Sequence, residues 1–145
     1  MGEAREVMDR VTAAIFGGDV ESSGNLYAAD AVAVTPDQGE FSGRDRIVAY
    51  HRQLHDAFPD SQYEQVAAHE SGNVAIDEGY VVGTHSGSLP TPSGDVAGTG
   101  RRIRVRTCDV ATVEGGVITN HRFYFDQLEL LEQLGLIPAE RATGR

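Results

Sequence analysis

Two strand-like segments in the C-terminal half of the chain carry the side chains best suited to acid–base chemistry. In residues 101–113 the odd positions are mainly apolar and include Asp109, whereas arginine recurs at even positions. In residues 117–125 the odd positions are again mainly apolar and include His121, although Ile118 is an exception. Because successive side chains of a strand point to opposite faces, the pattern predicts that Asp109 and His121 both face the interior.

The loop between these two segments decides whether the two side chains meet. A two-residue turn at Gly115-Gly116 would pair odd positions with even ones and turn one apolar set outward. A three-residue loop over Glu114–Gly116 pairs Val113 with Val117 instead, and Gly116 supplies the left-handed conformation that such loops require. This register sets Asp109 directly opposite His121 on one face.

A carboxylate beside an imidazole in an apolar pocket can act as an acid–base unit, since the carboxylate fixes the tautomer of the ring and raises its basicity. His121 would be the base or proton shuttle, and Asp109 would orient it or take the opposite role. A buried polar pair without chemistry is the alternative interpretation. Asp126, just past the second strand, is either a reserve catalytic carboxylate or the N-cap of a helix at 127–134.

The rest of the chain predicts an α+β fold in one domain over residues 1–145. A curved, mostly antiparallel sheet packs on N-terminal helices as a half-barrel, whose mouth suits a small ligand. The expected helices span 3–16, 20–27, 43–57 and 127–134, the expected strands span 31–35, 61–69, 74–85, 101–113 and 117–125, and residues 89–100 form a loop. The expected pocket residues are Phe16, Tyr27, Tyr50, His51, Phe58, His85, Val105, Thr107, Phe123 and Phe125.

Composition excludes several classes of function. The net charge of −10 disfavours nucleic acid and acidic membranes as partners. The chain contains no lysine, so a lysine Schiff base is excluded. No metal-ligand cluster is evident, and Cys108 has neither a partner for a disulfide nor a basic setting. Neither a secretory signal nor a membrane-length apolar segment is present, which favours the cytoplasm.

Three arginines at even positions form a one-sided basic stripe: Arg102, Arg104 and Arg106. The stripe is either a solvated outer face or a subunit interface paired with acidic groups. We expect a homodimer that uses this face.

Four segments together resemble the SnoaL-like polyketide cyclase (ester cyclase) family of the nuclear-transport-factor-two-like superfamily. They are Ala57-Phe58-Pro59-Asp60, the Gly-Thr-His-Ser-Gly of 83–87, the Gly-Gly-Val-Ile-Thr-Asn-His of 115–121, and 125–135 with its Leu-Leu-Glu-Gln-Leu-Gly ending. The resemblance implies a cone-shaped barrel, a homodimer without a cofactor, and an enzyme of secondary metabolism. Relatives in antibiotic biosynthesis close a polyketide ring by intramolecular aldol condensation, and so act as lyases or isomerases on small, largely apolar substrates.

One departure from the family concerns the catalytic carboxylate. The cyclases carry a His-x-Asp arrangement, where this chain has His121-Arg122-Phe123, and they place a histidine where this chain has Asp109. Hydroxylases, epoxide hydrolases and binding proteins share the fold. Epoxide hydrolysis would need two carboxylates and an arginine around one water. The alternation of side chains along the predicted strands places only one clear aspartate on the inner face. An open cavity with an unpaired polar edge would favour an enzyme over a binding protein.

Overall fold

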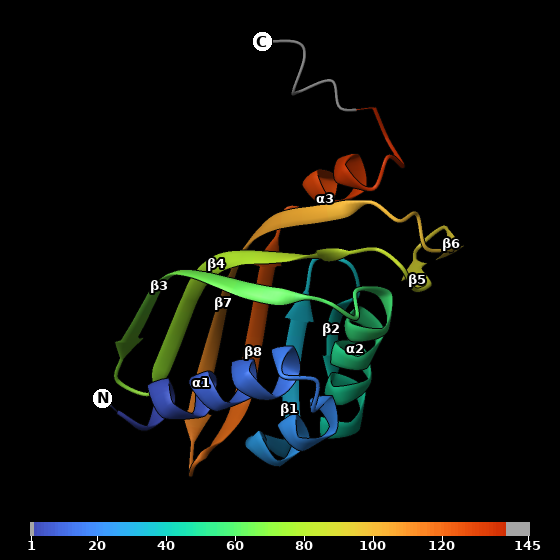
Figure 1. The fold of residues 1–145 in the computed structure, drawn as a ribbon. Coiled ribbons are helices and arrows are strands. Elements are labelled where there is room, and N and C mark those ends of the chain that lie inside the picture. Colours follow the sequence, from blue (N-terminus) through green and yellow to red (C-terminus); the bar gives the residue numbers. More distant parts are fainter. Residues whose placement is uncertain (1, 139–145) are drawn as a thin grey trace.

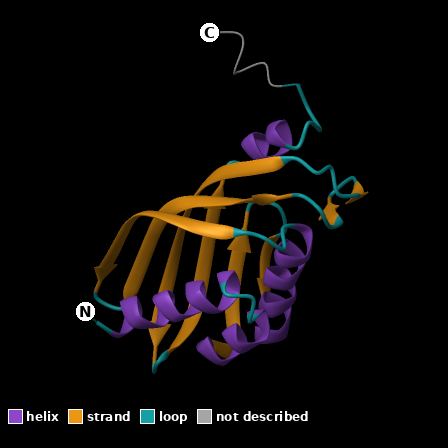
Figure 2. Ribbon diagram, viewed as in Figure 1, coloured by secondary structure: helices purple, strands orange, loops and turns teal. Residues whose placement is uncertain are grey.

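A computed structural model describes residues 2–138 and shows a strongly curved sheet with the N-terminal helices on its concave side (Figures 1 and 2). The helices are α1 (Glu3–Phe16), the 3₁₀ helix η1 (Val20–Leu26), α2 (Arg44–Ala57) and α3 (Gln127–Gln133). The strands are β1 (Tyr27–Thr35), β2 (Gly39–Ser42), β3 (Gln62–Ser71), β4 (Val74–Thr84), β5 (Leu89–Thr91), β6 (Gly94–Val96), β7 (Arg102–Glu114) and β8 (Val117–Phe125). The α+β prediction is confirmed.

The main sheet has the strand order β2-β1-β8-β7-β4-β3 and remains open. All its pairs are antiparallel except β1 with β8, which bring the N-terminal and C-terminal parts of the chain together. Two details differ from the sequence prediction. Residues 39–42 form an edge strand where only a turn was expected, and a β5–β6 hairpin lies within the expected loop 89–100.

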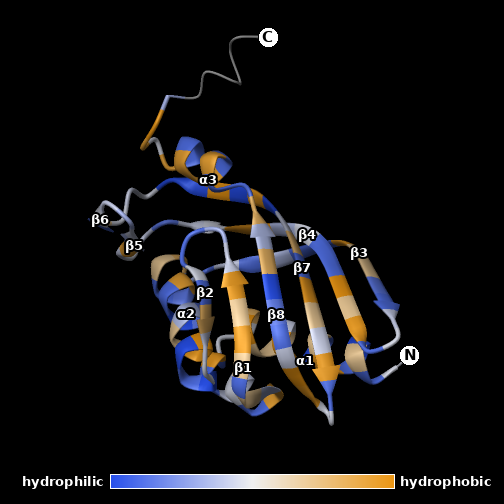
Figure 3. Ribbon diagram, turned by 180° about the vertical axis from the view of Figure 1, so that it is seen from behind, coloured by the Kyte–Doolittle hydropathy of each residue, from blue (hydrophilic) through white to orange (hydrophobic). Residues whose placement is uncertain are grey.

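The helices and the sheet enclose two clusters of buried apolar residues, and the larger one lies between the N-terminal helices and the sheet. Helix α1 presents apolar residues at helical spacing to the concave face, and α2 adds Ile47 from the side. Hydrophobic and hydrophilic stretches alternate along β4, β7 and β8 (Figure 3), as expected where one face packs against helices and the other meets solvent. No helix within residues 2–138 is long and apolar enough to span a membrane.

The β7–β8 hairpin has a different register from the predicted one. The turn is the two-residue Gly115-Gly116, with φ of +60° and +83°, a backbone that favours glycine at both positions. The pairing then shifts between Thr112 and Val113, so that one extra residue is accommodated on β8. The predicted three-residue loop and the direct pairing of Asp109 with His121 are therefore wrong.

The bulge nevertheless leaves Asp109 and His121 on the same inner face of the sheet, as predicted. Beyond it Ala111 pairs with His121 and Asp109 pairs with Phe123, so odd positions of both strands share the inner face. Asp109 and His121 are diagonal neighbours, a spacing that long side chains can span.

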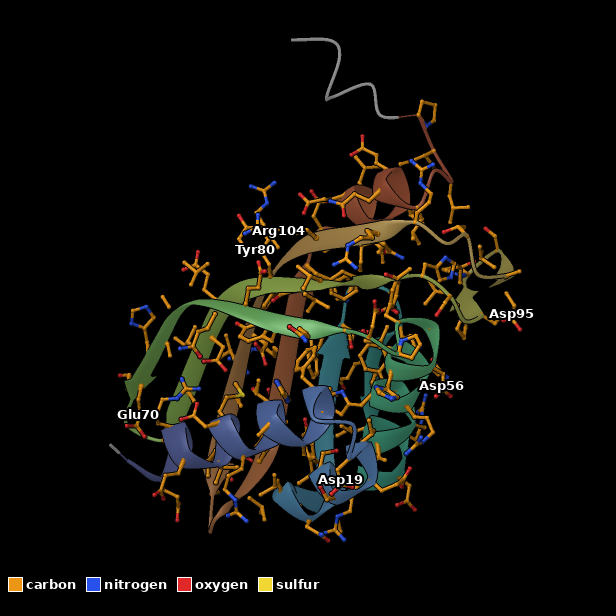
Figure 4. All side chains as sticks on the ribbon, viewed as in Figure 1. Asp19, Asp56, Glu70, Tyr80, Asp95 and Arg104 are labelled. Carbon is orange, nitrogen blue, oxygen red and sulfur yellow. The ribbon has the colours of Figure 1, made fainter. Side chains whose placement is uncertain are left out.

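The arginine stripe points outward as predicted. Its ion pairs are made with acidic groups of the same chain: Arg102 with Asp60, Arg104 with Glu64 and Arg106 with Glu129. Arg104 also lies 3.7 Å above the ring of Tyr80, and both project from the outer face of the sheet (Figure 4). The charges of the stripe thus have partners within one chain, and the homodimer stays a prediction.

A buried ion pair ties α1 to the sheet. Arg5 Nη2 lies 2.7 Å from Asp77 Oδ1, and both residues are buried. The same guanidinium donates to Asp9 and to the carbonyls of His69 and Ile76. Burial raises the pKa of Asp77, and the charge of Arg5 opposes that shift. Arg5 is therefore what allows a charged carboxylate to persist at this depth.

We predict that Arg5→Leu lowers the free energy of unfolding by about 3 kcal/mol at pH 7, because it leaves an uncompensated buried carboxylate. Loss of Arg5 raises the folded-state pKa of Asp77 further above its unfolded value. The deficit should thus grow as pH rises and shrink toward pH 4. Urea unfolding at both pH values measures this. Arg52→Leu, which breaks the exposed pair with Glu21, is the control and should cost less than about 1 kcal/mol. A deficit that is equal for both variants, or that does not change with pH, contradicts the assignment.

Candidate active site

A cavity of about 160 Å³ lies between the concave sheet and the helices α1 and α2. Its wall is predominantly apolar and aromatic. Ten of the predicted site residues lie on it: Phe16, Tyr50, His51, Phe58, Val105, Thr107, Asp109, His121, Phe123 and Phe125. The predicted pocket is therefore present, and the curvature of the sheet around the helices is what forms it.

Three predicted residues lie elsewhere. Asp126 caps α3 by accepting a hydrogen bond from the Glu129 amide at 3.1 Å, as the cap interpretation predicted, and it lies outside the wall of this cavity. His85 is fully buried and accepts from the Thr99 amide at Nδ1, which joins β4 to the segment before β7. Tyr27 lies behind the wall, buried between two imidazoles.

Asp109 and His121 are in contact, as predicted. His121 Nε2 lies 2.6 Å from Asp109 Oδ2, a short distance that suits an N–H donating to a carboxylate. The ring of Phe123 stacks on the imidazole with centroids 3.9 Å apart and limits its rotation. The geometry fixes the orientation of the carboxylate relative to the cavity.

The contact extends into a chain of four polar groups. The Tyr27 hydroxyl lies 2.8 Å from His121 Nδ1 and 3.0 Å from His51 Nε2. If a neutral His121 donates from Nε2 to Asp109, its Nδ1 must accept from the Tyr27 hydroxyl, whose oxygen then accepts from His51. Burial raises the pKa of Tyr27, and the charge of Asp109 adds to this, so the phenol keeps its proton. Every donor in the chain thus points toward the carboxylate.

The two members of the dyad differ in their access to the cavity. His121 is 1% exposed and both of its ring nitrogens are engaged. The Asp109 side chain is 20% exposed, and no hydrogen bond from residues 2–138 reaches its Oδ1. Asp109, not His121, is therefore the group with an atom available to a ligand.

A second inward carboxylate accompanies Asp109. Asp77 pairs directly with Asp109 across β4 and β7 and is held by Arg5. The count of one inward aspartate was therefore incomplete. Asp77 and Arg5 do not lie on the cavity wall, so the ion pair adjoins the site from behind.

Among the wall residues that sequence reasoning missed, two carry buried polar atoms that no described residue satisfies. His55 Nδ1 and the Tyr63 hydroxyl are buried and have no hydrogen-bond partner within the described residues. His55 follows His51 by one helical turn, and Tyr63 is paired with inward-facing Val81. These spacings were the available signals. Within residues 2–138 no group of three or more His, Cys, Asp or Glu side chains is arranged to hold a metal ion.

We predict that Tyr27→Phe lowers the free energy of unfolding by about 2 kcal/mol, because it leaves two buried imidazole nitrogens without a partner. Tyr80→Phe, which removes a hydroxyl from the outer face, should change it by less than about 0.5 kcal/mol. Chemical denaturation of both variants measures the difference. Equal stability of the two would show that the buried chain does not depend on the hydroxyl.

We also predict that His51 stays neutral in the folded protein at pH values well below those at which histidine ordinarily becomes protonated. Burial, with a smaller contribution from His121, lowers its pKa from 6.5 to about 3. Because the unfolded chain binds this proton and the folded one does not, stability should fall as pH decreases from 7 toward 3. The ring carbon NMR shift of His51 between pH 8 and pH 4 is the measurement. A titration near pH 6.5 would contradict the prediction.

The comparisons with known proteins agree with this fold. A SnoaL-like domain family matches residues 8–121, and a search of curated proteins found no significant match. A proposed SnoaL-like polyketide cyclase from Jannaschia sp. CCS1 superposes with a TM-score of 0.81 at 16% identity, covering 94% of each chain. AclR, a proposed hydroxylase from Streptomyces galilaeus, gives 0.80 at 23% identity, covering 94% of this chain and 83% of that one.

A third structure is IdmH, a proposed polyketide cyclase from Streptomyces antibioticus. It gives a TM-score of 0.76 at 22% identity and covers 92% of this chain and 99% of that one. The superpositions establish the shared fold, and the family match spans most of the sequence, including α2 and the strands up to His121. The chain belongs to the SnoaL-like family.

Proposed function

We propose that this protein is an acid–base catalyst in which Asp109 exchanges a proton with a small, apolar, oxygenated ring compound. One observation carries the proposal. A carboxylate opens on an aromatic cavity, with one oxygen held by His121 at 2.6 Å and the other without a partner among residues 2–138. A positioned carboxylate in an apolar environment is a more effective base than one in water, because no hydration shell must be removed when the proton is transferred.

The roles of the dyad follow from access to the cavity. Asp109 takes a proton from a carbon next to a carbonyl group, and the bonding pair becomes an enolate. The enolate carbon then attacks a second carbonyl of the same molecule, and protonated Asp109 returns the proton to the resulting alkoxide. His121 is a positioning residue, since it has no free ring nitrogen to offer. The steps balance without a redox partner or a cofactor.

The carboxylate has changed strands relative to the aldol cyclases that the sequence resembles. Asp109 pairs directly with Phe123, the position where those cyclases carry their aspartate. The acidic group therefore approaches a similar point of the inner face from β7 instead of β8. This supports a cyclisation or a related enolisation in secondary metabolism, with a polyketide-like substrate of antibiotic biosynthesis as the expected class. We retain the homodimer through the outer face as part of this proposal.

Epoxide opening is a second candidate, favoured by one observation. Asp77 lies opposite Asp109 with Arg5 bound to it, so two carboxylates and an arginine share one face of the sheet. A hydrolase of this kind activates water between such groups. Because Asp77 and Arg5 lie off the cavity wall, the enolisation proposal has the stronger geometric support.

A non-catalytic ligand-binding domain is the alternative from another class. A sealed interior with every polar group paired would support it. The cavity wall instead carries an oxygen of Asp109 and polar atoms of His55 and Tyr63 that have no hydrogen-bond partner among the residues that the structure describes. These unsatisfied groups favour an enzyme.

We predict that the protein accelerates α-proton exchange of small ring-containing ketones in D₂O. NMR would follow cyclohexanone, whose carbonyl lies in the ring, and 4-fluoroacetophenone, whose carbonyl is attached to the ring. Asp109→Asn keeps the shape of the side chain and removes the base, so the exchange rate should fall about 10²-fold or more. Asp126→Asn is the matched control, because asparagine also caps helices, and it should exchange at the native rate. Native exchange in Asp109→Asn, or no exchange of either ketone by the native protein, would reject the proposed function.

A further inference from the structure

The Tyr63 hydroxyl is a donor that the reaction outlined above does not use. Its oxygen is buried and no residue within 2–138 satisfies it with a hydrogen bond, although the side chain lines the cavity. The ring packs against Phe16 of α1 with centroids 5.7 Å apart, so its place on β3 is fixed from the helical side. A buried hydroxyl without a partner is unfavourable in the folded protein, so it calls for an explanation.

The local backbone makes room for this hydroxyl. A Cβ atom at Gly79 would lie 2.7 Å from the Tyr63 oxygen and would also clash with the Glu64 carbonyl oxygen. Only glycine at this position of β4 lets the phenol lie across the inner face of the sheet. The hydroxyl therefore reaches over β4 toward β7.

The register places the hydroxyl next to the reactive carboxylate. Gly79 pairs with Thr107, and Thr107 precedes Asp109 by two residues on the same face of β7. Two residues of a strand span about 7 Å. That span leaves room for a carbonyl oxygen hydrogen-bonded to Tyr63 and for its α-carbon in contact with Asp109.

The charges around the phenol keep it protonated. Burial raises the pKa of Tyr63, and the carboxylates of Asp77 and Asp109 raise it further. The Thr107 hydroxyl opposes this slightly, but without a hydrogen bond of good geometry to the Tyr63 oxygen. The group is therefore available as a neutral O–H donor and not as a base.

We propose that Tyr63 donates a hydrogen bond to the carbonyl oxygen of a ring ketone whose α-carbon faces Asp109, which names the substrate class as enolisable ring ketones; this rests on the proposed function. As Asp109 removes the α-proton, the C–H pair becomes the enolate double bond and the negative charge moves from the carboxylate to the oxygen bound by Tyr63. The site keeps the same net charge, and the donor meets the oxygen where charge develops.

Binding of 4-fluoroacetophenone, followed by ¹⁹F NMR, tests the donor without reference to turnover. Tyr63→Phe should weaken binding of the ketone about tenfold, on the scale of one hydrogen bond, and leave binding of fluorobenzene unchanged. Infrared spectroscopy of the ¹³C-labelled carbonyl should show a stretch at lower frequency in the native protein than in Tyr63→Phe. Tyr80→Phe, which alters a phenol on the outer face, is the matched control and should behave as native.

A loss of folding does not complicate the test. Tyr63→Phe removes a hydroxyl that no described residue satisfies, so the free energy of unfolding should stay unchanged or rise slightly. Equal affinity and equal carbonyl frequency in the native protein and Tyr63→Phe overturn the inference. Failure of the native protein to bind the ketone overturns it as well, whether or not fluorobenzene binds. A ketone held by Tyr63 but not deuterated leaves the inference standing and rejects the proposed function.

Discussion

The arrangement of the site depends on one constraint, the need to satisfy a line of buried polar groups. Tyr27, His51 and His121 come from β1, α2 and β8, and hydrogen bonds of 2.8 and 3.0 Å join them at a depth that bulk water does not reach. Each group would be costly if left alone, so the three elements must be held in one mutual position. The same constraint orients Asp109 toward the cavity. Tyr27 holds His121 through Nδ1, and the opposite ring nitrogen of His121 contacts the carboxylate.

The elements were predictable because their signals are local. Apolar spacing located α1 to the residue, and glycine or proline marked the ends of α2 and of the long strands. The inward facing of Asp109 and His121 was also predictable, even though the register was wrong. Two arrangements put odd positions on one face, a three-residue loop or a two-residue turn with a bulge, and alternation of side chains alone does not distinguish them.

The parts of the site that the sequence did not predict depend on contacts between segments far apart in the chain. Tyr27 reaches His121 because β1 runs parallel to β8, a pairing of residues far apart in the sequence. Tyr63 reaches the vicinity of Asp109 through β4, and its place depends on a glycine in a neighbouring strand. Polarity and alternation identify such residues only as candidates, since the partner that gives each one a role is set by sheet order.

The ion pair behind the site connects the stability of the fold with the proposed chemistry. Asp77 and Asp109 face each other on adjacent strands, and two bare carboxylates side by side would repel. Arg5 lies against Asp77 at 2.7 Å, so Asp109 adjoins a balanced pair instead of a bare charge. A residue in the first turn of α1 thus offsets the charge of the carboxylate that faces Asp109, without lying on the cavity wall. This is a physical reason for an arginine buried in the first turn of α1.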